Sequence, residues 1–198
     1  MKKFIIVLLL AFMTLGAVSA ADLYYEKGDS AFSFNLGVDF PVFIGFTKND
    51  KGIVTGTEGT HLKLGGYGSL SYQAFLTRKI ALGAELGYAF NYSRAEKLFN
   101  TIPITAKLSW YAFQNGKWDF IAHANLGIAV LRYDDQRYLS PHAEITISPV
   151  FYFTNSWGAG IKSGMWLNGE FYGSSSNKNG DSAVAGFVPL TLLLIYRH

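Results

Sequence analysis

The 198-residue sequence contains no cysteine, and this absence excludes two features that are common in exported proteins. Disulfide bonds, which hold many small secreted domains together, cannot form. A lipid-modified cysteine at the amino terminus is excluded as well. The fold must therefore be held together by other means.

Long apolar runs are also lacking beyond the amino terminus. A membrane-spanning helix needs ~20 apolar residues, and the longest later candidate covers only residues 190–195. At the amino terminus, Lys2 and Lys3 precede an apolar run over residues 4–15, which Val18-Ser19-Ala20 follows. This order predicts a secretory signal peptide over residues 1–20, which leaves residues 21–198 as one domain.

Charge is sparse and balanced, because charged residues make up only 16% of the chain. Without Lys2 and Lys3, 15 basic residues stand against 14 acidic ones, which is a net charge of +1. A nucleic-acid-binding surface needs a clear excess of basic residues. The sequence therefore predicts no nucleic-acid partner.

Glycine and aromatic residues are frequent, with 21 glycines and 16% aromatic residues in the whole chain, and apolar side chains alternate with small or polar ones in much of the sequence after residue 20. Residues 31–46 show the pattern most clearly. The apolar set occupies every even position: Phe32, Phe34, Leu36, Val38, Phe40, Val42, Ile44 and Phe46. A period of two is typical of a β-strand, because successive side chains point to opposite faces. Together these features indicate an all-β protein.

The same alternation predicts eight strands. They cover residues 31–46, 61–76, 80–92, 101–114, 118–131, 142–154, 157–172 and 183–197. Pro41, Pro149 and Pro189 fall inside these strands, where each removes a hydrogen-bond donor. We expect β-bulges or register shifts at these three positions.

The connections between the predicted strands alternate in length. Long polar connections are predicted at residues 47–60, 93–100, 132–141 and 173–182, and short ones at 77–79, 115–117 and 155–156. This alternation, with aromatic residues near both ends of the apolar face, is typical of transmembrane barrels. In such barrels the apolar face contacts lipid and the polar face lines the lumen. The predicted fold is an all-β, eight-stranded antiparallel up-and-down transmembrane β-barrel.

In these features the chain resembles the small eight-stranded bacterial outer-membrane β-barrels, such as the membrane domain of outer membrane protein A and its W- and X-type relatives. The resemblance lies in architecture and covers residues 31–198. It implies a monomer in the bacterial outer membrane, reached by export through the inner membrane. The implied partners are outer-membrane lipid, the barrel-insertion machinery and an extracellular ligand at the four loops. One departure is the end Tyr196-Arg197-His198, since such barrels usually finish on an aromatic residue.

Charged residues on the polar face form the candidate site, a lumen charge network. The alternation directs seven of them inward: Asp39, Lys63, Glu85, Lys107, Glu144, Lys162 and Glu170. We expect them to form ion pairs that fill the lumen, with Glu85 and Lys107 nearly opposite each other. The alternative is that they form a selectivity constriction.

Signals for catalysis are weak. The four histidines, His61, His123, His142 and His198, have no metal-ligand spacing, and no glycine-flanked nucleophile is present. The sequence therefore predicts no catalytic, cofactor-binding or metal site. We expect a structural or surface-interaction protein with a mostly filled lumen. The alternatives are a small channel or a lateral path for small apolar molecules, as the W-type resemblance implies, a lipid-modifying barrel enzyme, or a soluble barrel that binds a ligand inside.

Overall fold

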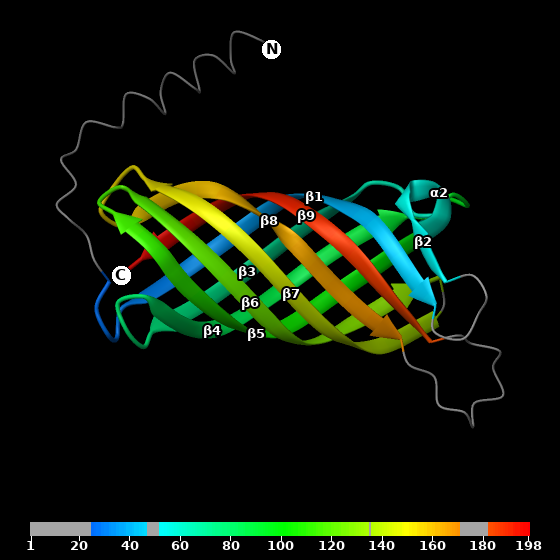
Figure 1. Cartoon of the computed structure of the whole chain (residues 1–198), viewed down its shortest axis with the longest axis horizontal. Helices are drawn as coiled ribbons and strands as arrows, with labels where there is room; N and C mark the ends of the chain where they lie inside the picture. Colours follow the sequence, from blue (N-terminus) through cyan, green and yellow to red (C-terminus); the bar gives the residue numbers. More distant parts are fainter. Residues whose placement is uncertain (1–24, 47–51, 135, 171–181) are drawn as a thin grey trace, which may run out of the picture.

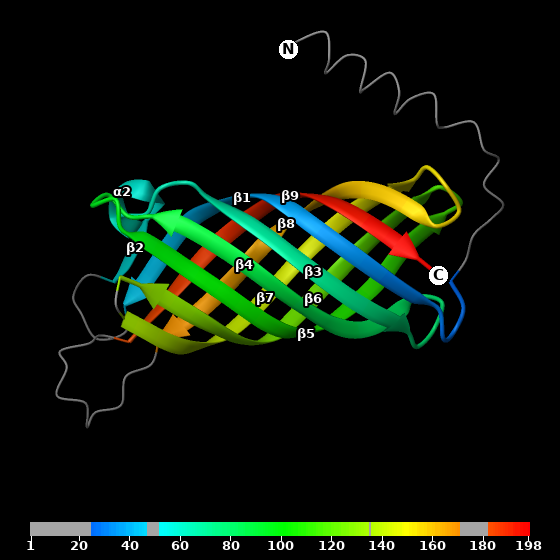
Figure 2. The ribbon, with the colours of Figure 1, turned by 180° about the vertical axis from the view of Figure 1, so that it is seen from behind.

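The computed structural model describes residues 25–46, 52–134, 136–170 and 182–198, and in these ranges the chain forms one closed antiparallel sheet (Figures 1 and 2). The long strands are β1 (Ser30–Phe46), β3 (Gly65–Phe75), β4 (Ile80–Tyr92), β5 (Leu98–Asn115), β6 (Trp118–Tyr133), β7 (Gln136–Tyr152), β8 (Trp157–Glu170) and β9 (Ala183–Arg197). A short strand β2 (Ile53–Thr55) and a one-turn helix α2 (Gly56–Thr60) follow β1. None of the helices in these ranges has the length and hydropathy needed to span a membrane.

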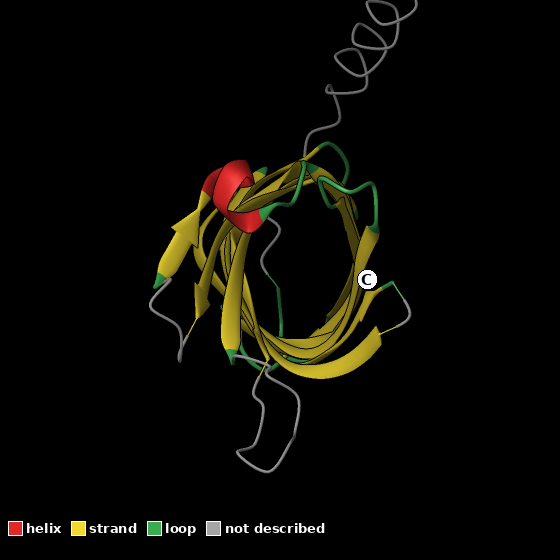
Figure 3. Ribbon diagram, turned by 90° about the vertical axis from the view of Figure 1, so that its right-hand side faces the viewer, coloured by secondary structure: helices red, strands yellow, loops and turns green. Residues whose placement is uncertain are grey.

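The barrel closes because β1 pairs with β9 along nearly its whole length, from Ala31–Arg197 to Phe46–Ala183. Each of the other long strands pairs with its neighbours in sequence, so the sheet has no long free edge (Figure 3). Closure is what a sheet needs in hydrocarbon, because no water is present there to satisfy unpaired backbone groups. The prediction of an eight-stranded antiparallel barrel is confirmed. The predicted signal peptide, residues 1–20, lies outside the described residues.

The two ends of the barrel differ. At one end lie the carboxyl terminus and the short connections 76–79, 116–117 and 153–156, and we call this the turn end. At the other end lie β2, α2 and the connection 93–97, and we call this the loop end (Figure 1). Of the predicted connections 47–60 and 173–182, residues 47–51 and 173–181 lie outside the described residues.

Apolar side chains cover the outer wall of the barrel. Leu126, Ile145 and Leu192 are each about 70% exposed, at 68%, 71% and 72%. Each has a neighbour along its strand that points inward and is polar: Asn125 at 1%, Glu144 at 3% and Thr191 at 2%. This distribution is the reverse of that in a soluble barrel, so the outer wall is built for contact with lipid.

Aromatic side chains are exposed on the outer wall near both ends. Tyr72, Trp110 and Trp157 lie toward the turn end, and Tyr88 and Tyr92 lie toward the loop end. Trp and Tyr side chains favour the two membrane–water interfaces, since their rings are apolar and carry one polar group. The two predicted aromatic belts therefore frame the apolar band.

A β-bulge at Pro41 changes the alternation at the end of β1. The ladder with β9 shifts register between Pro41 and Phe43, as predicted for this proline. The outward placement of Ile44 and Phe46 was wrong, because the extra residue reverses the two faces and these side chains line a cavity at the loop end. At Pro149 and Pro189 the ladder pairs are interrupted, but the predicted register shifts do not occur.

Two of the predicted long connections are shorter than expected. Tyr133 pairs with Gln136, so β6 and β7 form a tight hairpin where a loop over 132–141 was predicted. Leu98 already pairs with Tyr92, which shortens the connection predicted at 93–100. The ladders continue beyond the apolar band, where side chains no longer alternate in polarity. The prediction depended on that alternation and therefore ended these strands too early.

Inward-facing glycines bring neighbouring strands close together. A Cβ atom on Gly127 would collide with the backbone oxygen of Ile104 on β5, and one on Gly37 with the backbone oxygen of Leu190 on β9. Only glycine fits where two backbones approach in this way. These positions let a narrow barrel curve while larger side chains occupy its centre.

Leu86 lies in the middle of β4 and faces outward with 52% of its surface exposed, so it tests the contact with lipid. We expect Leu86→Arg to lower the free energy of unfolding in lipid vesicles by ~2–4 kcal/mol, because the charge enters hydrocarbon near the bilayer midplane. The matched control is Ile53→Arg on β2, which is 72% exposed outside the barrel wall and should cost less than about 0.5 kcal/mol. Equal losses in urea titrations of the two variants would contradict a lipid-facing outer wall.

Candidate functional site

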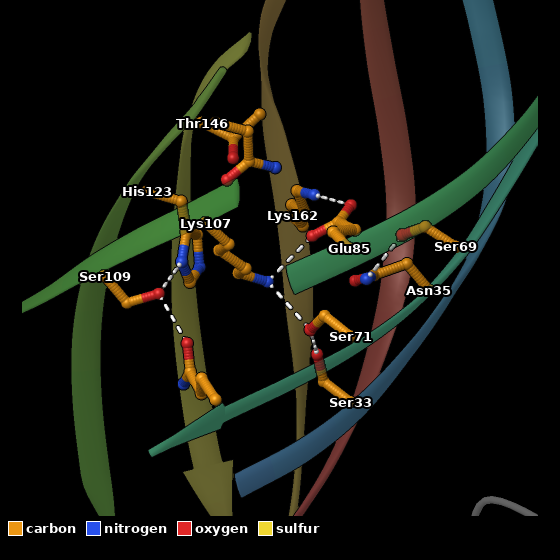
Figure 4. Close-up of polar contacts among 12 residues, drawn as sticks. Ser33, Asn35, Ser69, Ser71, Glu85, Lys107, Ser109, His123, Thr146 and Lys162 are labelled. Carbon is orange, nitrogen blue, oxygen red and sulfur yellow. Dashed lines mark hydrogen bonds and ion pairs between the residues drawn. The ribbon is translucent and has the colours of Figure 1, made fainter. Parts of the chain in front are cut away.

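Four charged side chains meet in the middle of the lumen, and we call Glu85, Lys107, Glu144 and Lys162 the central charge network. Lys107 Nζ lies 2.9 Å from Glu85 Oε2, and Lys162 Nζ lies 2.8 Å from Glu85 Oε1 (Figure 4). Lys162 Nζ also lies 2.7 Å from Glu144 Oε1. All four side chains are at most 2% exposed. The two lysines and two glutamates therefore neutralise one another away from water.

The network joins opposite walls of the barrel. Glu85 comes from β4, and Lys162 comes from β8, which does not pair with β4. An eight-stranded barrel has an interior just wide enough for side chains to fill, so residues from opposite walls can touch. Alternation along each strand points these residues inward, and the small diameter of the barrel brings them together.

Glu85 and Lys107 form the expected ion pair, but they are not directly opposite each other in the ladder. Glu85 pairs with Thr105, and Lys107 pairs with Gly83, so the two side chains meet diagonally. A long lysine side chain can reach a diagonal neighbour. Because Gly83 has no side chain, no group directly opposite Lys107 blocks this diagonal contact.

Hydroxyl, amide and imidazole groups surround the network and bond to one another (Figure 4). Lys107 Nζ also donates to Ser71 Oγ at 3.0 Å, and Ser71 Oγ lies 2.6 Å from Ser33 Oγ. Ser109 Oγ lies 2.8 Å from His123 Nδ1 and donates to Gln73 Oε1 at 2.6 Å. These contacts satisfy buried polar groups that would otherwise be costly.

An aromatic layer closes the lumen at the turn end. Tyr25, which precedes β1, is 1% exposed and stacks on Phe75 with ring centroids 3.8 Å apart. Its hydroxyl contacts that of Tyr152, and the Arg197 guanidinium lies over both rings, 5.1 Å from the Tyr25 centroid and 4.2 Å from the Tyr152 centroid. Burial, with a smaller contribution from the charge of Asp119, raises the pKa of Tyr25 to about 12. The hydroxyl therefore stays neutral at physiological pH.

A second aromatic layer lies toward the loop end. Trp166 stacks on Phe187 with ring centroids 4.1 Å apart and an interplanar angle of 11°. Trp166 Nε1 donates to Asp39 Oδ1 at 3.1 Å, which fixes the indole across the lumen. The central charge network is thus enclosed between two aromatic layers.

A cavity of about 700 Å³ lies at the loop end, on the far side of Phe187 from the network. Its lining combines apolar and polar side chains. The apolar part includes Ile44, Phe46, Leu62, Phe99, Leu131 and Phe187, and the polar part includes His61, Gln136, Asn168 and Glu170. A cavity of this size and lining suits a small molecule with an apolar body.

The seven charges predicted to face inward do not all meet. Glu85, Lys107, Glu144 and Lys162 form the central charge network, whereas Asp39 is buried and bonds to Trp166. Glu170 lies at the rim of the cavity. Lys63 does not face the lumen, because β3 begins only at Gly65. Its side chain is 49% exposed and pairs with Glu96.

The turn-end layer was missed by sequence reasoning. Tyr25 lies before the first alternating strand, and no pattern in the sequence indicates that it folds back into the barrel. Arg197 follows the inward parity of Leu193 and Ile195, so its inward direction could have been read from the alternation. For the stacking of Trp166 on Phe187 the sequence gives only a weak indication, because the alternation places both aromatic side chains on the inward face of neighbouring strands.

We expect Lys162→Met to lower the free energy of unfolding by ~3–5 kcal/mol, because Glu144 loses its lysine partner in a buried site. The control Lys63→Met removes an ion pair that is half exposed and should cost about 0–1 kcal/mol. Adding Glu144→Gln to Lys162→Met should recover more than half of the loss, since it removes the unpaired charge. Urea titration in lipid vesicles measures all three variants, and a Lys162→Met effect no larger than that of Lys63→Met would contradict the network.

Comparison with known proteins agrees with this architecture. Neisserial surface protein A (NspA) is a solved structure that is 10% identical and superposes with a TM-score of 0.56 over 86% of this chain and 97% of its own. The outer membrane protein OprG from Pseudomonas aeruginosa is 11% identical, with a TM-score of 0.46 over 90% of this chain and 99% of its own. The likeness to NspA shows a shared barrel fold.

A relative in sequence covers most of the chain. A protein of Borreliella burgdorferi (strain ATCC 35210 / DSM 4680 / CIP 102532 / B31), described as an uncharacterized protein, is 25% identical over 201 residues, which cover 88% of this chain and 91% of the relative. The barrel fold and the apolar outer wall place the protein in the bacterial outer membrane. A protein-family model whose description assigns no activity matches residues 17–196, and the chain belongs to that family.

Proposed function

We propose that the protein is a monomeric, non-conducting outer-membrane barrel that acts at its loop end, on the cell surface. The observation that carries this proposal is the filled lumen, in which the central charge network lies between two aromatic layers. A route through the barrel would have to displace paired charges and stacked rings at three levels. The cavity at the loop end, in contrast, opens away from these layers and offers a place for a ligand.

The proposal includes the route by which the chain reaches the membrane. Residues 1–20 act as a signal peptide, and residues 21–198 are inserted by the barrel-insertion machinery. The exposed ring of His198 stacks on Tyr196, with centroids 5.7 Å apart, so β9 presents aromatic rings near the turn end. With the turn end in the periplasm, α2 and the cavity face the outside of the cell.

Catalysis is not part of the proposed function. The Ser109–His123 pair resembles half of a hydrolytic triad, but His123 Nε2 faces Ser148 at 3.2 Å where a carboxylate would be needed. Ser109 is fully buried and His123 is 5% exposed, both inside the filled lumen. A substrate has no access to them, so their role is structural.

A path for small apolar molecules is the second candidate, and a depression on the outer wall favours it. This depression, of about 330 Å³, is lined by Leu126, Pro141, His142, Leu167 and Val184, among other residues. The ladder between β7 and β8 ends at the His142–Asn168 pair, close to this depression. Such a path would lead sideways from the cavity into lipid. It would differ from a pore by passing apolar molecules without conducting ions.

The surface location can be tested because the chain has no cysteine. We expect Thr57→Cys, on the exposed helix α2, to react with a membrane-impermeant maleimide on intact cells. The control Arg78→Cys, in the exposed connection 76–79 at the turn end, should react only after the outer membrane is permeabilised. The opposite pattern would place the loop end in the periplasm and contradict a surface role.

Conductance in planar bilayers tests the filled lumen. We expect the purified protein to give no steady ohmic current of the size that wide porins give, because the lumen is occupied at three levels. A wide porin measured in the same bilayers serves as the control for insertion. A steady current that Lys107→Ala or Lys162→Ala alters would support a selectivity constriction and refute the proposal.

A further inference from the structure

Two arginines stand side by side on the outer wall near the loop end. Arg132 on β6 and Arg137 on β7 are direct cross-strand partners, and both side chains are exposed. They share the outward face of the hairpin, because Arg132 follows Leu131, which is 4% exposed and points inward, and Arg137 is paired directly with Arg132. Like charges directly opposite each other destabilise a strand pair. The arrangement therefore needs an explanation.

Neither guanidinium has a carboxylate partner in the part of the chain that the structure describes. Asp134, the described acid nearest to them in sequence, pairs instead with Lys97. On the other side of Arg132, the neighbouring residue in the ladder is Asn100, an uncharged side chain that accepts a hydrogen bond from the Tyr88 hydroxyl at 2.8 Å. The two positive charges thus lie together on a neutral part of the wall.

The arginine pair borders directly on the apolar band. The next outward pair toward the turn end is Val130 with Leu139, which are 36% and 59% exposed. On β6 the outward residues from Phe120 to Val130 are all apolar. At ~3.3 Å per residue and a tilt of about 40°, this stretch covers roughly 25 Å along the barrel axis, which is the height of the apolar band in such barrels. Arg132 is the next outward residue, at the level of the lipid headgroups.

We propose that Arg132 and Arg137 bind the phosphate group of an anionic lipid in the leaflet around the loop end. Two adjacent guanidinium groups can donate several hydrogen bonds to one phosphate, and the anion removes the repulsion between them. The acyl chains of the same lipid then lie against Val130 and Leu139. Arg137 also borders the loop-end cavity, but both guanidinium groups lie on the outward face of the hairpin, so lipid can reach them without entering the cavity or the lumen.

Lipid retention measures the site directly. The full mature barrel is reconstituted in nanodiscs that contain equal amounts of phosphatidylglycerol and phosphatidylcholine, and native mass spectrometry counts the lipids that stay bound. On the unaltered protein we expect about fivefold more bound phosphatidylglycerol than phosphatidylcholine. On R132Q/R137Q we expect the two lipids to be bound in equal amounts, as they occur in the nanodisc. The substitution R132K/R137K keeps both charges but loses the planar fork, and should retain only part of the enrichment.

The matched control removes two positive charges elsewhere. Arg78 and Lys79 are exposed in the connection 76–79 at the turn end, and R78Q/K79Q should keep the enrichment. Equal loss in this control would show a general charge effect and overturn the site, as would an unaltered protein without enrichment. Circular dichroism checks that each variant is folded. Displacement of the lipid by millimolar inorganic phosphate would assign the pair to free phosphate and overturn the lipid proposal.

Discussion

The ammonium group of Lys162 lies between two carboxylates at the centre of the barrel, within 2.8 Å of both Glu85 and Glu144. Because Glu85 is also bound by Lys107, the four charges depend on one another. A buried ion pair is expensive to form and still more expensive to break, since the remaining charge has no water to replace its partner. This interdependence links β4, β5, β7 and β8 across the lumen and fixes the positions of their inward side chains.

The rest of the architecture follows from the placement of apolar side chains on the outside of the barrel and polar side chains on the inside, which is the reverse of a soluble protein. Lipid takes the place of water on the outer wall, so apolar side chains can cover it without a second layer of protein. Polar side chains then gather in the lumen, where they must bond to one another because the space is too narrow for bulk water. The aromatic layers at Tyr25 and Trp166 separate this polar centre from solvent at both ends.

Sequence alternation predicted the features that depend on one strand at a time. The eight strands, their two faces and the inward direction of Glu85, Lys107, Glu144 and Lys162 all follow from a period of two. Beyond a β-bulge, the alternation no longer predicts which side chains face inward. The bulge at Pro41 could be expected, but its reversal of Ile44 and Phe46 depends on whether the ladder gains a residue there.

Features that depend on three-dimensional proximity could not be derived from the sequence. The diagonal meeting of Glu85 with Lys107 depends on the register between β4 and β5, and the contact between Glu85 and Lys162 depends on the barrel diameter. The β6–β7 hairpin extends to Tyr133 and Gln136, and the sequence did not indicate this extension. Side chains beyond the membrane need not alternate between polar and apolar. Lys63 fits the alternation in the sequence, but β3 begins only at Gly65, so the alternation does not determine the direction of the Lys63 side chain.

Measuring the position of the Lys162 ammonium in a membrane tests the filled lumen directly. Solid-state NMR on the protein in lipid bilayers can measure the distance from the Lys162 ¹⁵Nζ nucleus to the carboxyl carbons of Glu85 and Glu144. A filled, ion-paired lumen predicts that both distances are those of direct ion pairs, with no exchange of the ammonium protons with bulk water. A lysine that lies far from both carboxylates and exchanges rapidly with water would show an open, hydrated lumen and refute the central charge network.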